Sequence, residues 1–363
     1  MDKKEQLLRI KKIFSFTSKI DIILIMNNDI PDPNFLYLTG FTSGLFEYSY
    51  LILERDKVTL FTSSLEYETA IETAPEGMNI IKMDPSVDFR SQLSNLVKGK
   101  VVGINEFFIP YGLYKLITKR YQIKKTVDIS KALSKSRMIK DNEELSLIKK
   151  SVSITKWALI MIQKEFKENI TERELAAKFD QISASLGSYE PSFKTIVCFG
   201  KNAALPHHSP DNTKLKKGDF ILIDAGAKVN NYCSDMTRTF IFSEPNDSPD
   251  YKAKSKMIKV VKEAQLKSIH AIKPGIKCST IHKIAADYID AVDDGYYKGK
   301  FIHALGHSLG IEVHDGTGFS PGVNQLIKPG MVITVEPGIY IPGFGGVRIE
   351  DDIIVTKDGA EIL

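Results

Sequence analysis

Residues 216–224 read Lys-Lys-Gly-Asp-Phe-Ile-Leu-Ile-Asp, and residues 328–336 read Lys-Pro-Gly-Met-Val-Ile-Thr-Val-Glu. Both stretches have a lysine, a turn glycine two residues later, a mostly apolar run and a carboxylate eight residues after the lysine. The apolar runs predict β-strands, and the strand expected next in each copy carries a further acid, Asp235 or Glu350. The pattern therefore predicts two similar halves that each supply two carboxylates to one centre.

The four acids of this repeat need a partner. Asp224 and Glu336 each end a strongly apolar run, where an unpaired carboxylate is costly. A single acid there would be explained by structural hydrogen bonds, but four acids in repeated context favour a buried cation. Two divalent ions would neutralise about four negative charges, and a metal pair that holds a water between its ions is a known hydrolytic arrangement.

The elements around the repeat predict an α+β unit. Asp141 with Glu144 forms a capping-box pattern before a long amphipathic helix, and Thr171 with Glu174 opens a second one. Ser248 with Pro249 predicts a third helix, and Ser279 is the expected cap of a fourth. Strands are expected at 195–199, 220–224, 238–242, 331–336 and 347–355. Helices that cover one face of a mostly antiparallel sheet are the simplest arrangement.

The first part of the chain predicts a separate α/β unit. Strands are expected at 21–26, 48–54, 57–62 and 101–105, with helices at 65–73 and 89–97. The chain has 363 residues, which suggests two domains. Between residues 115 and 140 nine Lys or Arg face one acid, a run that could touch nucleic acid but more often forms a solvated face or a linker.

Composition excludes several classes of protein. With 43% hydrophobic and 26% charged residues the chain is expected to be globular, and no apolar run is long enough for a membrane span. The net charge of +4 is small for a nucleic-acid binder. The N-terminus lacks the pattern of a secretory signal. Three widely spaced cysteines, Cys198, Cys233 and Cys278, favour free thiols in a reducing cytoplasm.

Histidines supply the remaining candidate groups. His303 and His307 have the spacing of a zinc-protease helix, but residue 304 is Ala where that motif needs a Glu, and the segment is rich in glycine. The segment is better explained as a loop that directs His303, His307 and His314 toward one pocket. His207 is a further candidate.

Taken together, these motifs resemble the metallopeptidases of the pita-bread fold, the methionine aminopeptidase and prolidase clan. The resemblance is carried by the segments Ile223-Asp-Ala-Gly226, Asp235-Met-Thr-Arg238, His303-Ala-Leu-Gly-His307, Glu336-Pro-Gly338 and Val347-Arg-Ile-Glu-Asp351. Tyr37-Leu-Thr-Gly-Phe41 is similar to the proline-specific branch, which comprises Xaa-Pro dipeptidases (prolidases) and Xaa-Pro aminopeptidases. The resemblance implies a creatinase-like α/β N-terminal domain at 1–130, a linker at 131–140 and a pita-bread catalytic domain at 141–363.

The resemblance also implies roles for individual residues. Asp224 would bind one metal, His307 and Glu336 the other, and Asp235 and Glu350 would bridge both. Glu336 would also pass a proton to the leaving proline nitrogen. Three histidines, His207, His303 and His314, would line the substrate pocket and steady the tetrahedral intermediate, and Arg348 would pair with a ligand carboxylate or with the substrate. One histidine among oxygen ligands favours manganese or cobalt, with zinc or iron as the alternatives.

Several functions stay open at this point. The first is a peptidase that cleaves Xaa-Pro dipeptides, and the second is an Xaa-Pro aminopeptidase that acts on longer peptides. A non-catalytic binding module on the same fold is a third, but such relatives have lost metal ligands. A small peptide is the expected partner, with neither nucleic acid nor membrane, and the resemblance implies a homodimer.

Overall fold

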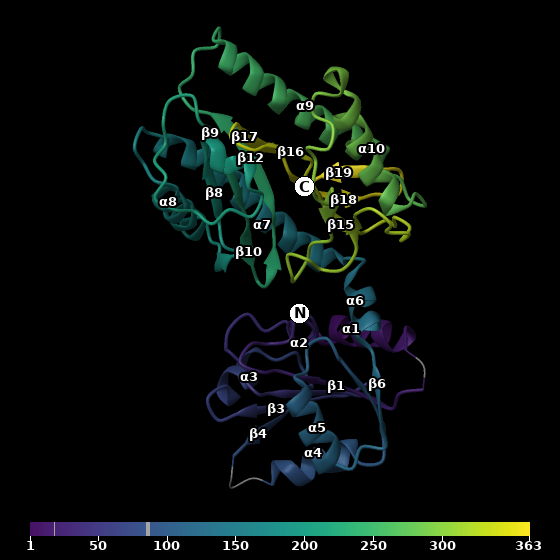
Figure 1. The fold of residues 1–363 in the computed structure, drawn as a ribbon. Coiled ribbons are helices and arrows are strands. Elements are labelled where there is room, and N and C mark those ends of the chain that lie inside the picture. Colours follow the sequence, from purple (N-terminus) through teal and green to yellow (C-terminus); the bar gives the residue numbers. More distant parts are fainter. Residues whose placement is uncertain (18, 85–87) are drawn as a thin grey trace. The chain divides into compact units, whose positions relative to one another are not determined.

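The computed structural model describes residues 1–17, 19–84 and 88–363, and these form two compact units, Met1–Arg137 and Met138–Leu363. In Figure 1 the first unit runs from purple to blue and the second from teal to yellow. Each unit has its own buried apolar residues. In the described part of the chain, no helix combines the length and the apolar character needed to cross a bilayer.

The first unit is built around a six-stranded mixed sheet in the order β4-β3-β2-β1-β5-β6. The central strand β1 is buried along its whole length, and it pairs antiparallel with β2 and parallel with β5. The strands are β1 (Ile22–Met26), β2 (Tyr50–Leu53), β3 (Val58–Ser63), β4 (Asn79–Met83), β5 (Val101–Ile104) and β6 (Lys125–Asp128). The expected α/β character of this unit is confirmed, although β4 and β6 were not predicted.

The helices of the first unit include several that the sequence patterns did not indicate. They are α1 (Lys3–Ser15), α2 (Pro33–Thr39), α3 (Tyr67–Thr73), α4 (Phe89–Val97), α5 (Tyr111–Arg120) and α6 (Ser130–Arg137). Helix α6 occupies most of the range expected as a linker, and it buries Leu133. The division between the two units falls after Arg137. Lys140, from the basic run, is itself buried, and its ammonium pairs with Asp315 at 3.0 Å.

The second unit is α+β, and all the strand pairs recorded in it are antiparallel. Its helices are α7 (Asn142–Met161), α8 (Glu172–Ser185), α9 (Pro249–Ala271) and α10 (Cys278–Ala291), with short 3₁₀ turns η1 (Ile162–Glu165), η2 (Gly200–Ala204) and η3 (Asp293–Gly295). The first half holds β7 (Glu190–Pro191), β8 (Ile196–Phe199), β9 (Phe220–Ala225), β10 (Ala227–Val229), β11 (Tyr232–Cys233) and β12 (Met236–Ile241). The second half holds β13 (Gly306–His307), β14 (Gly318–Phe319), β15 (Val332–Val335), β16 (Gly338–Ile341), β17 (Gly345–Arg348), β18 (Asp351–Val355) and β19 (Ala360–Ile362).

Local capping explains where the long helices begin. Asp141 and Glu144 form a complete capping box at α7, and Thr171 and Glu174 form one at α8, as expected. The cap expected for α10 is wrong. Lys277 precedes that helix without a side-chain cap, because carbonyl oxygens of the loop at 323–325 accept from the first amides of the helix instead.

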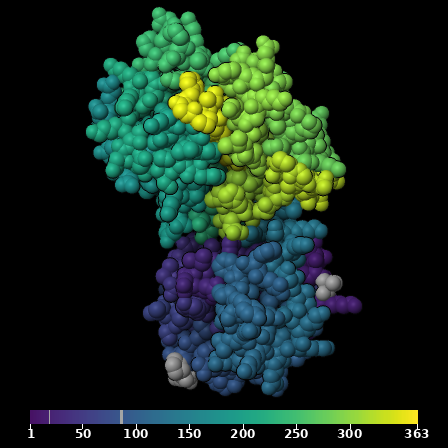
Figure 2. Space-filling model, in the orientation of Figure 1, coloured from purple at the N-terminus to yellow at the C-terminus, as the bar shows by residue number. Residues whose placement is uncertain are grey.

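The repeated stretches form two hairpin-like strand pairs. Strand β9 pairs with β12, and β15 pairs with β18, both antiparallel. The space-filling view shows the corresponding halves of the second unit, teal to green and yellow-green to yellow, beside each other on the surface (Figure 2). The single strand expected over 347–355 is wrong, because the chain changes partner there. Strand β17 pairs with β16, the amide of Glu350 donates to the Thr237 carbonyl, and β18 then pairs with β15.

Candidate functional site

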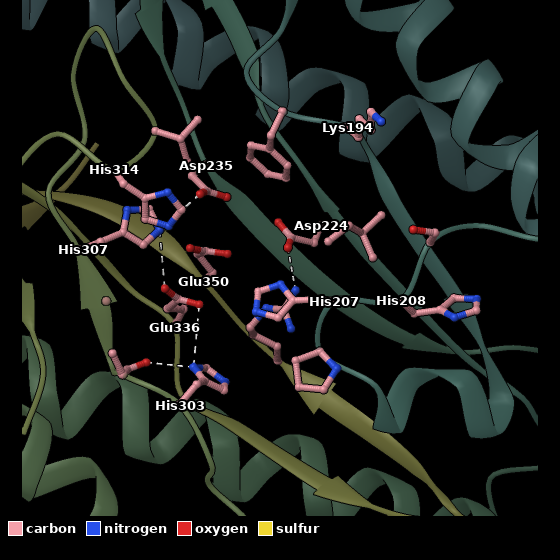
Figure 3. Close-up of a pocket in the computed structure, with 18 of the residues that line it drawn as sticks. Lys194, His207, His208, Asp224, Asp235, His303, His307, His314, Glu336 and Glu350 are labelled. Carbon is pink, nitrogen blue, oxygen red and sulfur yellow. Dashed lines mark hydrogen bonds and ion pairs between the residues drawn. The ribbon is translucent and has the colours of Figure 1, made fainter. Parts of the chain in front are cut away.

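Five side chains from both halves of the second unit meet in one pocket (Figure 3). Asp224 is the last residue but one of β9, and Asp235 immediately precedes β12. His307 ends β13, Glu336 directly follows β15, and Glu350 lies in the break between β17 and β18. In each half one acid therefore ends the first strand of a pair and the other precedes the second strand.

Close approach of the backbone allows this convergence. Gly306 lies against β15, where an added Cβ would come within 1.9 Å of the Thr334 carbonyl oxygen. The amide of His307 donates to Thr334 Oγ1 at 3.0 Å. A residue larger than glycine at 306 would therefore displace the strand that carries His307 away from Glu336.

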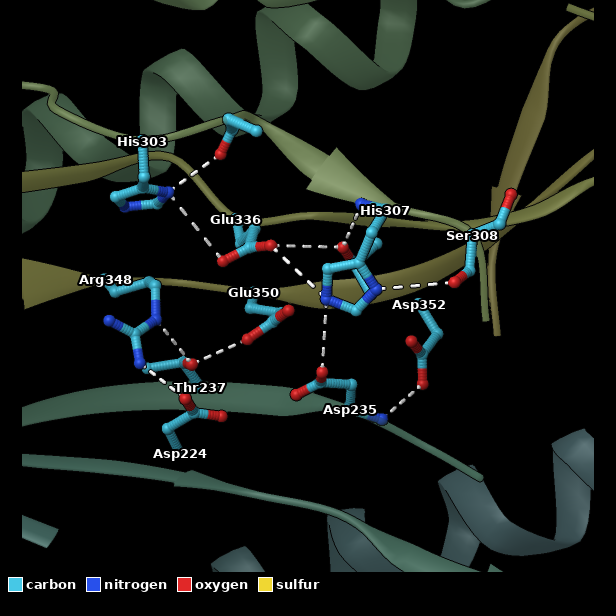
Figure 4. Close-up of polar contacts among 12 residues, drawn as sticks. Asp224, Asp235, Thr237, His303, His307, Ser308, Glu336, Arg348, Glu350 and Asp352 are labelled. Atoms are coloured by element: carbon cyan, nitrogen blue, oxygen red, sulfur yellow. Dashed lines mark hydrogen bonds and ion pairs between the residues drawn. The ribbon is translucent and has the colours of Figure 1, made fainter. Parts of the chain in front are cut away.

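The distances are those of a ligand cluster (Figure 4). His307 Nε2 lies 3.5 Å from Asp235 Oδ2 and 3.6 Å from Glu336 Oε1. Ligand atoms of Asp235, His307 and Glu350 all lie within 4.8 Å of one another. Such spacing brings several donors within reach of one cation.

Buried oxygens without partners support the presence of cations. Asp224 Oδ1 and Asp235 Oδ1 are buried, and no hydrogen bond to either is found among the described residues. Asp235 is 4% exposed and Glu350 1% exposed. Leaving anionic oxygens buried and unpaired is costly, whereas binding to a divalent ion would satisfy them. The residues present therefore fit a divalent-metal centre.

The cluster also changes proton affinities. Burial, and then the neighbouring carboxylates, raise the pKa of Asp235 and of Glu350 well above the usual range. Burial raises the pKa of Glu336 to about 7. Burial lowers the pKa of His307 to about 4, so its imidazole is neutral at pH 7, as a metal ligand must be.

Arg348 connects the two halves of the site. Its Nη2 donates to Asp224 Oδ2 at 2.5 Å, its Nε to Thr237 Oγ1 at 3.0 Å and its Nη1 to the Tyr340 hydroxyl at 2.9 Å. Thr237 Oγ1 in turn donates to Glu350 Oε2 at 2.6 Å. Of the two partners expected for Arg348, a ligand carboxylate or the substrate, this structure contains the carboxylate.

The candidate pocket histidines have different surroundings. The pKa of His303 is lowered to about 4, by burial first and then by Arg348, so the ring is neutral at pH 7. Its Nδ1 lies 2.7 Å from the Ala304 carbonyl, which makes Nδ1 the donor and leaves Nε2 to accept from the Tyr340 hydroxyl at 2.8 Å. His207 and His314 also line the pocket and are exposed, and the His314 ring contacts the His307 ring at a tilt of 50°, with centroids 4.2 Å apart.

The pocket has a volume of about 800 Å³, within the range of small-ligand sites. Apolar residues also line it, including Phe193, Ile196, Pro206 and Val313. A small peptide fits such a space, with its reacting bond near the carboxylates.

A second group of potential ligands borders the same pocket but is already satisfied. Glu172 Oε1 accepts from the Phe199 amide at 2.7 Å and from Asn202 Nδ2 at 3.0 Å. Its Oε2 accepts from His208 Nε2 at 2.7 Å and from the Asp211 amide at 3.0 Å. Because both oxygens are occupied by donors, we interpret this cluster as an anchor for the loop at 205–211 rather than as a metal site.

The structure brings all the residues singled out from the sequence into this pocket. Sequence reasoning missed Thr237, Tyr340 and Glu172, which hold those residues in place. Thr237 lies in the segment Asp235-Met-Thr-Arg238, but no spacing in the sequence links it to Glu350. Glu172 directly follows the cap residue Thr171, and no pattern in the sequence marked it.

Comparison with known proteins covers both units. Residues 146–357 match metallopeptidase family M24, and residues 9–139 match the Creatinase/Prolidase N-terminal domain. An Xaa-Pro dipeptidase of Pyrococcus horikoshii is 35% identical over 98% of this chain and 96% of its own length.

Solved structures give the same result. The Xaa-Pro dipeptidase from Bacillus anthracis has a TM-score of 0.87 and 30% identity, covering 99% of this chain and 97% of that one. An X-Pro aminopeptidase from Thermotoga maritima has a TM-score of 0.85 and 29% identity, covering 94% of this chain and 95% of that one.

Proposed function

The chain belongs to metallopeptidase family M24, and we propose that it hydrolyses Xaa-Pro dipeptides with two divalent metal ions. Its pita-bread fold and smaller creatinase-like N-terminal domain are those expected from the sequence. The observation that carries the proposal is the meeting of four carboxylates and one neutral imidazole in a pocket with unpartnered carboxylate oxygens.

Five residues would hold the metals. Asp224 would bind one ion, His307 and Glu336 the other, and Asp235 and Glu350 would bridge both. When bound, the ions lower the pKa of a water between them and polarise the scissile carbonyl. The predominance of oxygen ligands supports manganese or cobalt.

The protein's own side chains would carry the proton and steady the developing charge. Glu336 lies at the pocket beside His307 and can accept the proton of the attacking water and pass it to the proline nitrogen. His207 and His314 have no hydrogen bond from their ring nitrogens to other described residues, so either can donate to the carbonyl oxygen. His303, whose two nitrogens are engaged, would act through Tyr340 and Arg348 to hold Asp224.

Hydrolysis of Ala-Pro, Ala-Pro-Ala and Ala-Ala by metal-reconstituted protein tests the proposal. We expect manganese- or cobalt-dependent cleavage of Ala-Pro, with Ala-Ala hardly cleaved and Ala-Pro-Ala roughly tenfold or more poorer, because an added residue would leave the carboxylate-binding cation unpaired. A better rate on Ala-Pro-Ala would make the protein an Xaa-Pro aminopeptidase, the alternative that the Thermotoga structure supports. Absence of metal-dependent cleavage would overturn the proposal.

The cellular setting belongs to the same proposal. The three described cysteines are free and buried, which supports a reducing compartment such as the cytoplasm. A homodimer remains a prediction from the resemblance, and light scattering of the purified protein tests it.

A further inference from the structure

A dipeptide substrate brings a free carboxylate into a pocket that already contains four carboxylates. If the proposed function is right, a cation must meet that terminal carboxylate, because binding an anion unpaired in such a pocket is unfavourable. The identity of this cation decides whether the site prefers dipeptides to longer peptides.

Arg348 is the first candidate, but its guanidinium is already committed. All three of its nitrogens donate to other groups, namely Asp224, Thr237 and Tyr340, and the residue is 3% exposed. Turning it toward a substrate would break a buried ion pair and free two further polar groups. Arg348 therefore holds the site together and leaves the substrate's carboxylate to another residue.

Lys194 is the one other lysine or arginine among the described residues that line the pocket. It is exposed, and its ammonium has no ion pair or hydrogen bond with other described residues. Figure 3 shows it at the edge of the pocket, apart from the carboxylate cluster. It is thus a free cation next to the space that a substrate must enter.

Lys194 comes two residues before β8, the strand that pairs with β9 beside the site. Ile196, in β8, pairs directly with Asp224 in β9, and directly opposite residues point to the same face. Thr195 donates to Asp180 Oδ1 at 2.6 Å, whereas Lys194 lines the same pocket as Ile196 and Asp224.

We propose that the Lys194 ammonium binds the terminal carboxylate of an Xaa-Pro dipeptide and thereby selects dipeptides over peptides extended beyond proline. The contact is made equally in the bound substrate and in the transition state. Its loss should therefore change KM and leave kcat nearly constant.

The test compares Ala-Pro with its amide, Ala-Pro-NH2, which has the same shape but no terminal charge. Lys194→Met should raise KM for Ala-Pro roughly tenfold, keep kcat within about twofold and leave KM for the amide unchanged. Lys194→Arg should restore the preference for Ala-Pro. Lys201→Met removes an exposed lysine that does not line the pocket, and it is the matched control. It should leave KM and kcat unchanged for both substrates.

Salt gives an independent reading. KM of the wild-type protein for Ala-Pro should rise with sodium chloride, and this dependence should be weaker for the amide and for Lys194→Met. If Lys194→Met leaves the ratio of the KM values for Ala-Pro and Ala-Pro-NH2 unchanged while the wild type cleaves Ala-Pro normally, the role of Lys194 is overturned and the proposed function stands. A wild-type protein that does not cleave Ala-Pro would overturn the proposed function and this inference together.

Discussion

Asp235 and Glu350 have the most strongly altered environments of the proposed ligands. Both are almost fully buried, and each faces further carboxylates that raise its pKa well above the usual range after burial itself. In the metal-free protein they therefore keep their protons at pH values where an ordinary carboxyl group is ionised. A metal binds only the ionised form, so metal and protons compete for the same oxygens.

Metal binding should release protons, and more of them at pH 6 than at pH 8, because Glu336, with a pKa of about 7, holds a proton only at the lower pH. Calorimetric titration with manganese in two buffers of different ionisation enthalpy measures that number. The apparent affinity should fall as the pH falls, because the raised carboxyl pKa values favour the protonated, metal-free form. The same titration at pH 8, above the pKa of Glu336, is the control. Equal heats in both buffers at pH 6 would contradict the raised pKa values of Asp235 and Glu350.

Two histidines should separate metal binding from catalysis. His307→Ala removes a ligand and should lower the metal content found by elemental analysis. His207→Ala should retain two ions per chain yet lower kcat by roughly 10²–10³-fold, the scale for loss of one donor to the developing oxyanion. Loss of metal in both variants would show that His207 is needed for metal binding and not only for the reaction.

At the scale of elements, one carboxylate at the start of α8 fixes a loop of the pocket. Glu172 accepts from the backbone of β8 and of residue 211, and from the side chains of Asn202 and His208. His207, beside His208, lines the pocket. The position of His207 therefore depends on a helix terminus that lies far in sequence from the proposed metal ligands.

Replacing Glu172 should damage both stability and the pocket. Glu172→Gln places an amide NH₂ against buried donors, so we expect a loss of about 2–3 kcal/mol in the free energy of unfolding, measured with urea. The kcat on Ala-Pro should fall while the metal content stays unchanged. The matched control is Glu174→Gln at the same helix start, since glutamine also serves in a capping box. Similar stability of the two variants would refute the anchoring role.

At the scale of the whole molecule, the cluster of buried carboxylates lowers the stability of the metal-free protein as the pH rises. The folded protein keeps protons on Asp235 and Glu350 at pH values where the unfolded chain has lost them. Such groups contribute stability fully below their unfolded pKa, and this contribution is lost as the pH rises through the folded pKa. His303 and His307 have lowered pKa values, so their contribution to stability increases with pH, but only up to about pH 6.5.

The metal-free protein should therefore lose thermal stability as the pH rises above about 6.5, and the metal-loaded protein should lose much less. Differential scanning calorimetry with and without a chelator measures the two Tm curves. Asp235→Asn removes one of the repelling carboxyls, so its metal-free form should be at least as stable as the wild type at pH 8 while gaining less from metal. Parallel curves for the loaded and metal-free wild type would exclude this linkage.

The sequence by itself determined the fold class, the first strand of each copy of the repeat and the starts of three of the four long helices in the second unit. These features depend on local chemistry: a capping box lies within four residues, and a strand reveals itself by a continuous apolar run. The same repeat singled out the four acids, because carboxylates at the ends of buried strands are unusual wherever they occur.

Only the tertiary structure decided what holds those acids in place. Arg348 meets Asp224 across 124 positions of sequence, and Thr237 meets Glu350 across 113. Glu172 accepts from the amide of Phe199 in β8, and Lys194 lines a pocket whose other residues come from both halves of the second unit. Partners at such separations leave no periodicity in the sequence, since what brings them together is the pairing of β9 with β8 and β12 and the change of partner between β17 and β18.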